Sequence, residues 1–174
     1  MAIWGNISRM DVIDRKILAQ LQVDGRLTVT ELADRVGLSL SPCHRRVRSL
    51  EEAGVIRDYR ARLDAAALGL NFRAIVFATL REGDRTAVQA FEAAVSALPE
   101  VIQAQRLFGD PDYILHVVCA DLDAFQKLYD DRLSALPKVQ RLTSTLVMKS
   151  VVEDRLLPLS GAAATVWATH SKTE

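Results

Sequence analysis

The sequence has few cysteines and lacks the long apolar runs that mark membrane and secreted proteins. Its 174 residues include only two cysteines, Cys43 and Cys119, which are too few for a disulfide framework and suit a reducing compartment. No apolar run approaches the ~20 residues of a membrane-spanning helix, and the first ten residues lack the apolar stretch of a secretory signal. We therefore expect a cytoplasmic protein without membrane contact.

Motifs for nucleotide, metal and acid/base chemistry are also missing. Neither a G-x-x-x-x-G-K-[ST] loop nor a G-x-G-x-x-G turn occurs. The three histidines, His44, His116 and His170, lack metal-ligand spacing, and no pair of carboxylates stands out as an acid/base dyad. We expect no catalytic residue, metal ion or cofactor.

Charge is balanced over the chain but concentrated in one segment. The 22 Lys and Arg residues match the 22 Asp and Glu residues, which argues against a basic nucleic-acid coat. Arg45, Arg46 and Arg48 nevertheless lie within four positions, which predicts a local DNA-reading surface.

The segment from Ser41 to Ala53 predicts the helix that carries this surface. Apolar residues recur at i, i+4 and i+7 and form one stripe, Cys43, Val47 and Leu50. The opposite face and its flanks carry Ser41, His44, Arg45, Arg46, Arg48 and Glu52. Ser41 is expected to cap the helix, with Pro42 in its first turn and Gly54 after its end. Such a helix suits the major groove of DNA, although a solvated helix is the alternative.

Two helices are predicted before this one. The first begins near Met10, carries the stripe Ile13, Ile17, Leu18 and Leu21, and ends at Asp24-Gly25. The second opens at Thr28 or Thr30, turns Leu32, Ala33 and Val36 inward, and ends at Gly37. This order is the helix-turn-helix pattern. Residues 55–62, with interspersed arginines, predict a short strand or wing.

The second half of the sequence has a different order of predicted elements, in which strands alternate with helices. Strands are expected over 72–80, 101–108, 113–119 and within 139–152, and helices over 85–97 and 121–134. The corner sequences SALPEV and SALPKV follow the two helices at equivalent places. The order β-α-β-β-α-β indicates a ferredoxin-like unit in an α+β protein. We expect a DNA-binding domain over 10–62, a linker over 63–70, this unit over 71–152, and a tail over 153–174.

The first strand of this unit is apolar on both faces. Ala74 and Val76 share one face, and Ile75 and Phe77 share the other. Because two helices can cover only one face of such a sheet, we expect the other face to meet a second subunit. Cover by the linker and tail of the same chain is the alternative.

The sequence resembles the Lrp/AsnC family of leucine- and asparagine-responsive transcriptional regulators. The resemblance covers roughly residues 10–159 and rests on IDRKILAQLQVDGRLTVTELADRVGLS, SPCHRRVRSLEEAGVI and FGDPDYILHV. It implies a winged helix-turn-helix that binds double-stranded DNA and a βαββαβ domain that senses a small effector, commonly an amino acid. It also implies homo-oligomers, as dimers or octamers, at the nucleoid in the cytoplasm. It does not explain residues 1–9 or those beyond Leu159.

Candidate sites follow from the residues and from this resemblance. Arg45 and Arg48 are expected at base edges and Arg46 at a phosphate, with Ser41 and His44 beside them. In the family, the turn that matches residues 109–113 lies at an effector cleft between subunits. Its backbone N–H groups suit a carboxylate, and Asp110 suits an ammonium. The effector candidates are Gly109, Asp110, Pro111, Asp112, Tyr113, Thr143 and Thr145. A plain hairpin turn is the alternative.

Two other functions compete with an effector-responsive regulator. One is an architectural protein that wraps DNA without an effector. The other is an enzyme that resembles sirohaem decarboxylases, which place histidines at a tetrapyrrole. Only His116 is placed for that role.

Overall fold

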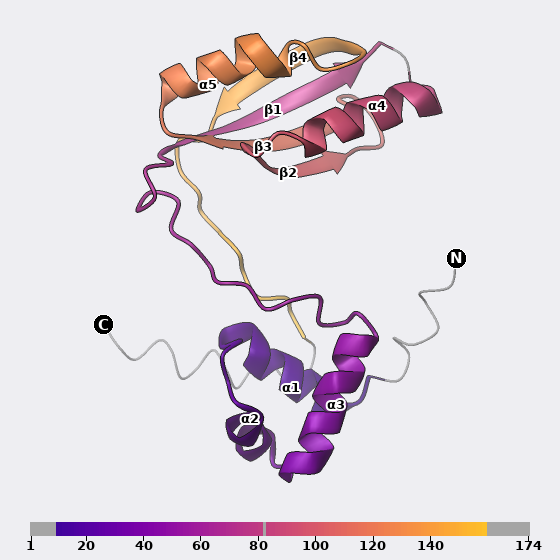
Figure 1. Ribbon diagram of the computed structural model, residues 1–174, viewed down its shortest axis with the longest axis vertical. Coiled ribbons are helices and arrows are strands. Elements are labelled where there is room, and N and C mark those ends of the chain that lie inside the picture. The colour runs from indigo at the N-terminus through magenta and orange to yellow at the C-terminus, as the bar shows by residue number, and fades with distance from the viewer. Residues whose placement is uncertain (1–9, 82, 160–174) are drawn as a thin grey trace. The chain divides into compact units, whose positions relative to one another are not determined.

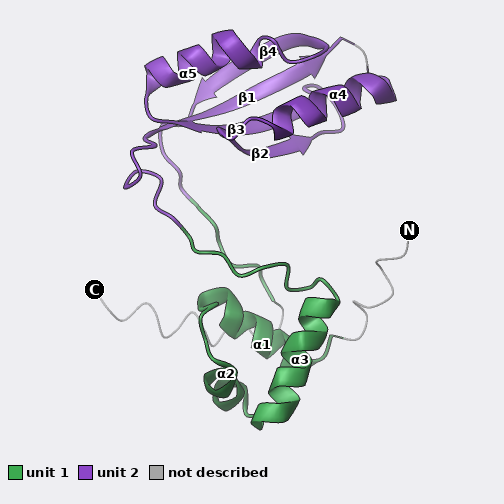
Figure 2. Ribbon diagram, in the orientation of Figure 1, with its two compact units in different colours: residues 1–62, 152–174 green, residues 63–151 purple. Residues whose placement is uncertain are grey.

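The computed structural model describes residues 10–81 and 83–159, which form two compact units (Figure 2). Unit 1 takes the described parts of residues 1–62 and 152–174, and unit 2 takes residues 63–151. The expected extension at 1–9 and the end of the expected tail, 160–174, lie outside the described residues. No helix in the described ranges is both long and apolar enough to cross a membrane.

Unit 1 contains three helices, α1 (Val12–Val23), α2 (Val29–Val36) and α3 (Leu40–Glu52) (Figure 1). The first two begin with reciprocal capping boxes, Asp11 with Asp14 and Thr28 with Glu31. Gly37 ends α2 in the left-handed conformation at φ 74°, as expected. The apolar stripes of all three helices meet in one core, which confirms the residues predicted to point inward: Ile17, Leu18, Leu32, Ala33, Val36, Cys43, Val47 and Leu50.

Two expectations around α3 were wrong. The helix begins two residues earlier than predicted, at Leu40 instead of Pro42, so Ser39 rather than Ser41 is the N-cap, and the Ser39 side chain makes no capping hydrogen bond. Residues 55–62 form no strand in the described structure: Val55 and Ile56 form a bend, and their N–H groups both donate to the Leu50 carbonyl of α3, at 2.9 and 3.2 Å. Gly54, at φ 68°, does follow the end of the helix as predicted.

The segment after the last strand returns to unit 1. Residues 152–159, which we call the C-terminal strap, include part of the expected tail. Arg62 forms an ion pair with Asp154 at 3.2 Å. Leu159 packs against the core of the three helices. The DNA-binding unit is therefore built from two separate pieces of chain.

Unit 2 contains an antiparallel sheet in the order β2-β3-β1-β4. Its strands are β1 (Phe72–Leu80), β2 (Val101–Arg106), β3 (Tyr113–Cys119) and β4 (Val139–Leu146). The helix α4 (Arg85–Ser96) joins β1 to β2, and α5 (Leu122–Leu128) follows β3. The second helix was expected to run to Ser134, but a π-helical turn, η2 (Tyr129–Leu133), completes it. This element and strand order confirms the ferredoxin-like α+β fold.

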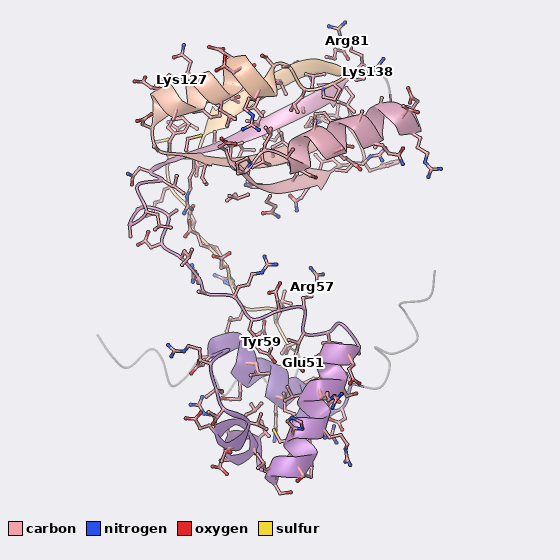
Figure 3. All side chains as sticks on the ribbon, in the orientation of Figure 1. Glu51, Arg57, Tyr59, Arg81, Lys127 and Lys138 are labelled. Atoms are coloured by element: carbon pink, nitrogen blue, oxygen red, sulfur yellow. The ribbon has the colours of Figure 1, made fainter. Side chains whose placement is uncertain are left out.

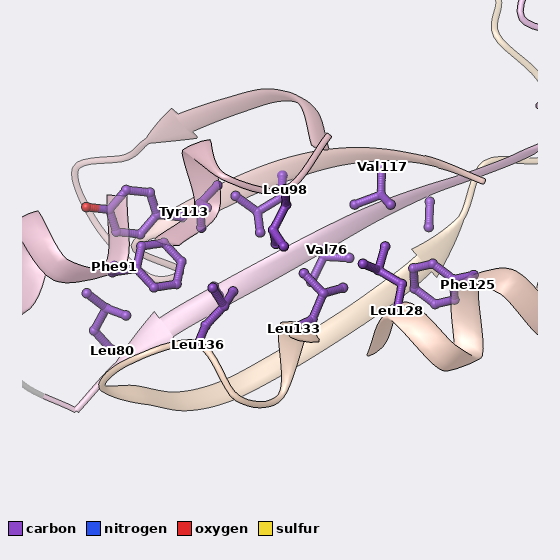
Figure 4. Packing of buried hydrophobic residues seen from close by; sticks show 14 of the residues in the cluster. Val76, Leu80, Phe91, Leu98, Tyr113, Val117, Phe125, Leu128, Leu133 and Leu136 are labelled. Carbon is purple, nitrogen blue, oxygen red and sulfur yellow. The ribbon is translucent and has the colours of Figure 1, made fainter. Parts of the chain in front are cut away.

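Both helices of unit 2 cover the same face of the sheet (Figure 1). Phe91 of α4 and Phe125 of α5 pack on Val76 and its neighbours from the central strands (Figure 4). The opposite face carries Ile75 and Phe77 on β1, which are only half-buried. The two-faced pattern of β1 is therefore real, and one apolar face has no helix over it.

Candidate functional sites

The outer face of α3 presents most of the residues that the sequence assigns to DNA. Four of them are exposed, Ser41, His44, Arg45 and Arg48. Arg45 makes no hydrogen bond or ion pair with another described residue, so its guanidinium is available. Arg48 pairs with Glu52 on its own helix at 2.9 Å, and both side chains are largely exposed. Such a surface pair is weak and easily opened.

Arg46 differs from its neighbours because it has partners on another helix. Its NH1 atom lies 2.8 Å from Asp11 Oδ2 and 2.7 Å from Asp14 Oδ1. The two carboxylates raise the pKa of Arg46. The backbone hydrogen bond from Asp14, helped by Arg46, lowers the pKa of Asp11. From the sequence we predicted that Arg46 contacts a DNA phosphate. The sequence did not indicate its ion pairs with Asp11 and Asp14.

A hydrogen bond from Tyr59 connects the segment after α3 to that helix. The hydroxyl of Tyr59 donates to Glu51 Oε1 at 3.0 Å (Figure 3). Burial, followed by this hydrogen bond, raises the pKa of Tyr59 to about 12. The arginines expected on the wing lie on both sides of Tyr59 in the sequence, and Arg60 pairs with Asp58 at 2.8 Å.

A hollow of about 430 Å³ opens where the β2–β3 hairpin meets the end of β1 and the start of β4. We call it the hairpin hollow. Its lining consists of Thr79, Leu80, Gly109, Asp110, Asp112, Gln140 and Arg141. The pairing of β1 with β4 shifts register between Thr79 and Leu80. Such irregularities re-aim side chains and are frequent beside functional sites.

Opposite charges face each other in the hairpin hollow. Arg141 NH2 lies 3.2 Å from both carboxylate oxygens of Asp110, and the hydroxyl of Thr79 donates to Asp110 at 3.1 Å. Asp112 accepts the backbone N–H of Leu80 at 2.8 Å, which ties the hairpin to β1. The hollow thus offers one guanidinium and two carboxylates to a small molecule.

The structure brings only part of the expected effector set to this hollow. Gly109, Asp110 and Asp112 line it, and Pro111 lies between them in the turn. Thr143 and Thr145 are exposed on β4 beside Phe77 and Ile75, away from the lining residues.

Tyr113 is also outside the lining of the hollow, because it belongs to the core. It is 3% exposed, stacks near Phe91 at 4.6 Å between ring centroids, and donates to Glu92 at 2.8 Å. Burial, followed by the Glu92 hydrogen bond, raises the pKa of Tyr113 to about 12.

Sequence reasoning missed four lining residues, Thr79, Leu80, Gln140 and Arg141. The signal that could have found them is the strand order. A ferredoxin-like sheet pairs its first and last strands, so the end of β1 lies opposite the start of β4. Candidate residues at these two ends therefore belong to one corner.

Potential metal ligands and the histidine of the sheet lie as follows. The described residues hold no cluster of three or more potential metal ligands. His116 is half-buried on β3, where Ile75 and Gln103 are its neighbours on the adjacent strands.

Comparison with known proteins agrees with this geometry. Residues 10–57 match winged helix-turn-helix DNA-binding domains, and residues 73–157 match the Lrp/AsnC ligand binding domain. The chain is 43% identical over 142 residues to a leucine-responsive regulatory protein of Rhizobium meliloti, a match that covers 82% of this chain and 91% of that protein. It is 40% identical over 144 residues to a proline dehydrogenase transcriptional activator of Rhodobacter capsulatus, covering 83% and 94% of the two chains.

A solved structure leads to the same family. A transcriptional regulator from Neisseria meningitidis, crystallised as a complex with L-Met, superposes with a TM-score of 0.81 at 39% identity. The match covers 86% of this chain and 97% of that one. With two matched domains and relatives along most of its length, this chain belongs to the Lrp/AsnC family of transcriptional regulators.

Proposed function

We propose that this regulator reads DNA with the outer face of α3 and senses an amino acid in the hairpin hollow. The observation that carries the proposal is the hollow itself, in which Arg141 faces Asp110 at 3.2 Å. Once this ion pair opens, the guanidinium and the carboxylate are complementary in charge to the carboxylate and the ammonium of an α-amino acid.

DNA reading is assigned to the exposed residues of α3. Arg45 donates to a base edge, because it is exposed and has no partner among the described residues. Arg48 joins it when the pair with Glu52 opens, and Ser41 and His44 contact the DNA beside them. Assigning phosphate binding to Arg46 is not supported by its contacts with Asp11 and Asp14.

The effector is proposed to replace the contact between Asp110 and Arg141 with its own contacts to these two side chains. Its carboxylate takes Arg141 and the backbone N–H groups of the turn, and its ammonium takes Asp110. The Asp110–Arg141 pair is exposed and long, so opening it costs little. The L-Met complex of the Neisseria meningitidis regulator is a precedent for an amino acid in a related protein. Thr143 and Thr145 stay candidates only if a second subunit extends the site.

A homo-oligomer, a dimer or an octamer, is proposed to form through the open sheet face. Ile75 and Phe77 leave apolar area on this face, which a second copy would bury. Light scattering on the full chain tests this, with Phe77→Glu expected to lower the mass. Gln126→Glu, on the exposed side of α5, is the matched control. A monomeric parent protein at micromolar concentration would refute the proposal.

The experiment for the main proposal has two stages. The protein first selects duplexes from a random-sequence pool, and the enriched duplex is then titrated with and without each of the twenty amino acids. We expect tighter binding to the enriched duplex than to a random one, and a change in affinity with at least one amino acid. Equal binding to both duplexes would reject DNA reading, and an unchanged affinity throughout would reject sensing.

The competing functions are not favoured by the relatives. The matched domain is a ligand binding domain and the relatives are regulators, which fits a chain that is neither an effector-free DNA wrapper nor an enzyme. A regulator that reads DNA acts where the chromosome is, so we place it in the cytoplasm at the nucleoid.

A further inference from the structure

The contacts of Arg46 distinguish it from every other residue on the outer face of α3. We propose that Arg46 is a positioning residue: it fixes the recognition helix against the start of α1 and does not itself contact DNA. The inference rests on the proposed reading of DNA by α3. In this proposal Arg46 holds α3 in the orientation that DNA binding requires, and other residues of α3 contact the DNA.

The partners of Arg46 are themselves held in place. One oxygen of each carboxylate serves the capping box: Asp11 Oδ1 accepts the Asp14 N–H at 2.8 Å, and Asp14 Oδ2 accepts the Asp11 N–H at 3.2 Å. The other oxygen of each faces Arg46, at 2.8 and 2.7 Å. All four oxygens are therefore engaged, so the carboxylates can follow a shift of Arg46 only by breaking their capping-box hydrogen bonds.

Burial also separates this contact from an ordinary surface pair. The side chain of Arg46 is 32% exposed and that of Asp14 only 15%. In the neighbouring Arg48–Glu52 pair both side chains are about twice as exposed as Arg46, and both lie on one helix. A pair within one helix does not constrain that helix relative to another, whereas the Arg46 contacts join α3 to α1.

The rest of the α1–α3 contact is apolar and therefore less directional. Cys43, Val47 and Leu50 hold α3 on the core by burial, which tolerates small rotations and slides. Charge-assisted hydrogen bonds prefer a narrow range of distances and angles. Arg46 lies directly before Val47 at the edge of this seam, so its bonds fix the rotation at which the outer face meets a groove.

Electrostatics argues against a second role at a phosphate. Two carboxylates face one guanidinium, so this cluster of three side chains carries a net charge of −1. A DNA phosphate approaching NH1 would compete with both carboxylates and be repelled by them. A contact of this kind would require the positioning bonds to break.

The test compares Asp14→Asn and Arg46→Gln with the parent protein on an enriched duplex and on a random one, across a range of salt. Asparagine keeps an oxygen for the capping box. If Arg46 only positions α3, Asp14→Asn weakens binding to the enriched duplex about fivefold, a loss typical of removing one coupled contact. Removing a carboxylate near DNA would otherwise strengthen binding. Arg46→Gln gives a loss at least as large, because it also removes the Asp11 contact, and its salt dependence equals that of the parent.

Two further variants make the outcome decisive. The double variant Arg46→Gln/Asp14→Asn loses no more than Arg46→Gln alone, because Arg46→Gln already removes the contacts with both Asp11 and Asp14. Glu52→Gln, the matched control, removes a carboxylate from α3 itself and leaves binding equal or stronger. Thermal unfolding of each full chain shows whether it is folded at the assay temperature. If Arg46→Gln fails to fold, the sign of the Asp14→Asn effect decides alone.

The inference is overturned if Asp14→Asn binds the enriched duplex as well as the parent or better. It is also overturned if Arg46→Gln lowers the salt slope by about one, the signature of a lost phosphate contact. A parent protein that does not distinguish the two duplexes would instead reject the proposed function, so the two failures are separable.

Discussion

The side chain of Gln22 pairs with the backbone of Leu157 in both directions. The backbone N–H of Leu157 donates to Gln22 Oε1 at 2.7 Å, and Gln22 Nε2 donates to the Leu157 carbonyl at 3.4 Å. The side-chain amide of Gln22, near the end of α1, thus binds the backbone of the C-terminal strap as a neighbouring β-strand would, with one donor and one acceptor. Two residues farther on, Leu159 reaches the core of the three helices.

The strap is therefore expected to stabilise the DNA-binding unit. Gln22→Ala should lower the free energy of unfolding of unit 1 by about 1 kcal/mol, because a hydrogen-bonded backbone contact is lost. Leu159→Ala should cost a similar amount, about 1 kcal/mol, through lost packing. Amide hydrogen exchange in α1 to α3 reports this unit separately from the sheet.

Leu157→Ala is the matched control for the strap. Its side chain is 72% exposed, and its hydrogen bonds with Gln22 use only the backbone atoms of Leu157. Protection of α1 should therefore be unchanged. If Gln22→Ala and Leu159→Ala also leave it unchanged, the strap rests on unit 1 without supporting it.

Arg45 is expected to carry sequence preference. Arg45→Ala should weaken binding to the enriched duplex by about 1–3 kcal/mol and relax the preference at one base position. The reason is that its guanidinium is exposed and has no partner among the described residues, so it can bind a base without first breaking another contact. Selection repeated with the variant measures the change. A loss of equal size on random DNA would assign Arg45 to the backbone of the duplex instead.

Asp110 is expected to be needed for the response and not for DNA binding. Asp110→Ala removes the group assigned to the ligand ammonium, so the effect of the best amino acid on DNA affinity should vanish. Affinity without the amino acid should stay close to that of the parent. Calorimetry with that amino acid, followed by DNA titration, measures both.

Two variants control for Asp110→Ala. Arg141→Gln, at the opposite end of the proposed ligand, should also abolish the response. Asp131→Ala, exposed on η2 outside the hollow, should retain it. If Asp110→Ala binds and responds like the parent, the hairpin is only a turn.

Alkaline pH should weaken unit 2 through Tyr113. Its pKa is raised from 10.0 to about 12 in the folded chain, because burial and Glu92 disfavour the phenolate. The resulting stability is fully present below pH 10 and is lost as pH rises toward about 12. Tyr113→Phe cannot ionise, so its unfolding should depend less on pH in this window. Denaturant unfolding from pH 9 upward, followed by hydrogen exchange or circular dichroism of the sheet, compares the two proteins.

Local patterns predicted the elements of this fold well. The inward residues of the three helices follow from their spacing, and the glycines after α2 and α3 follow from the left-handed conformation that they adopt. The ferredoxin-like order follows from the succession of strands and helices. The alternation along β1 also predicted correctly that one face of the sheet carries no helix.

What the sequence missed depends on partners far away along the chain. The hairpin hollow joins Thr79 to Arg141, and the contacts of Arg46 join residues more than thirty positions apart. Ser41 looked like a cap by residue type, yet the backbone turns into the helix at Ser39. Tyr113 looked available in its motif, but its place in the core depends on α4.

The return of the strap has a consequence for how the protein is made. The ribosome releases the three helices first, while Leu159 is still to be synthesised after the whole of unit 2. Among the described residues, the core of the three helices therefore lacks Leu159 until the sheet of unit 2 has been synthesised. A nascent chain cut short within the sheet therefore lacks the Leu159 contact in the core of the three helices as well as part of the ligand-binding domain.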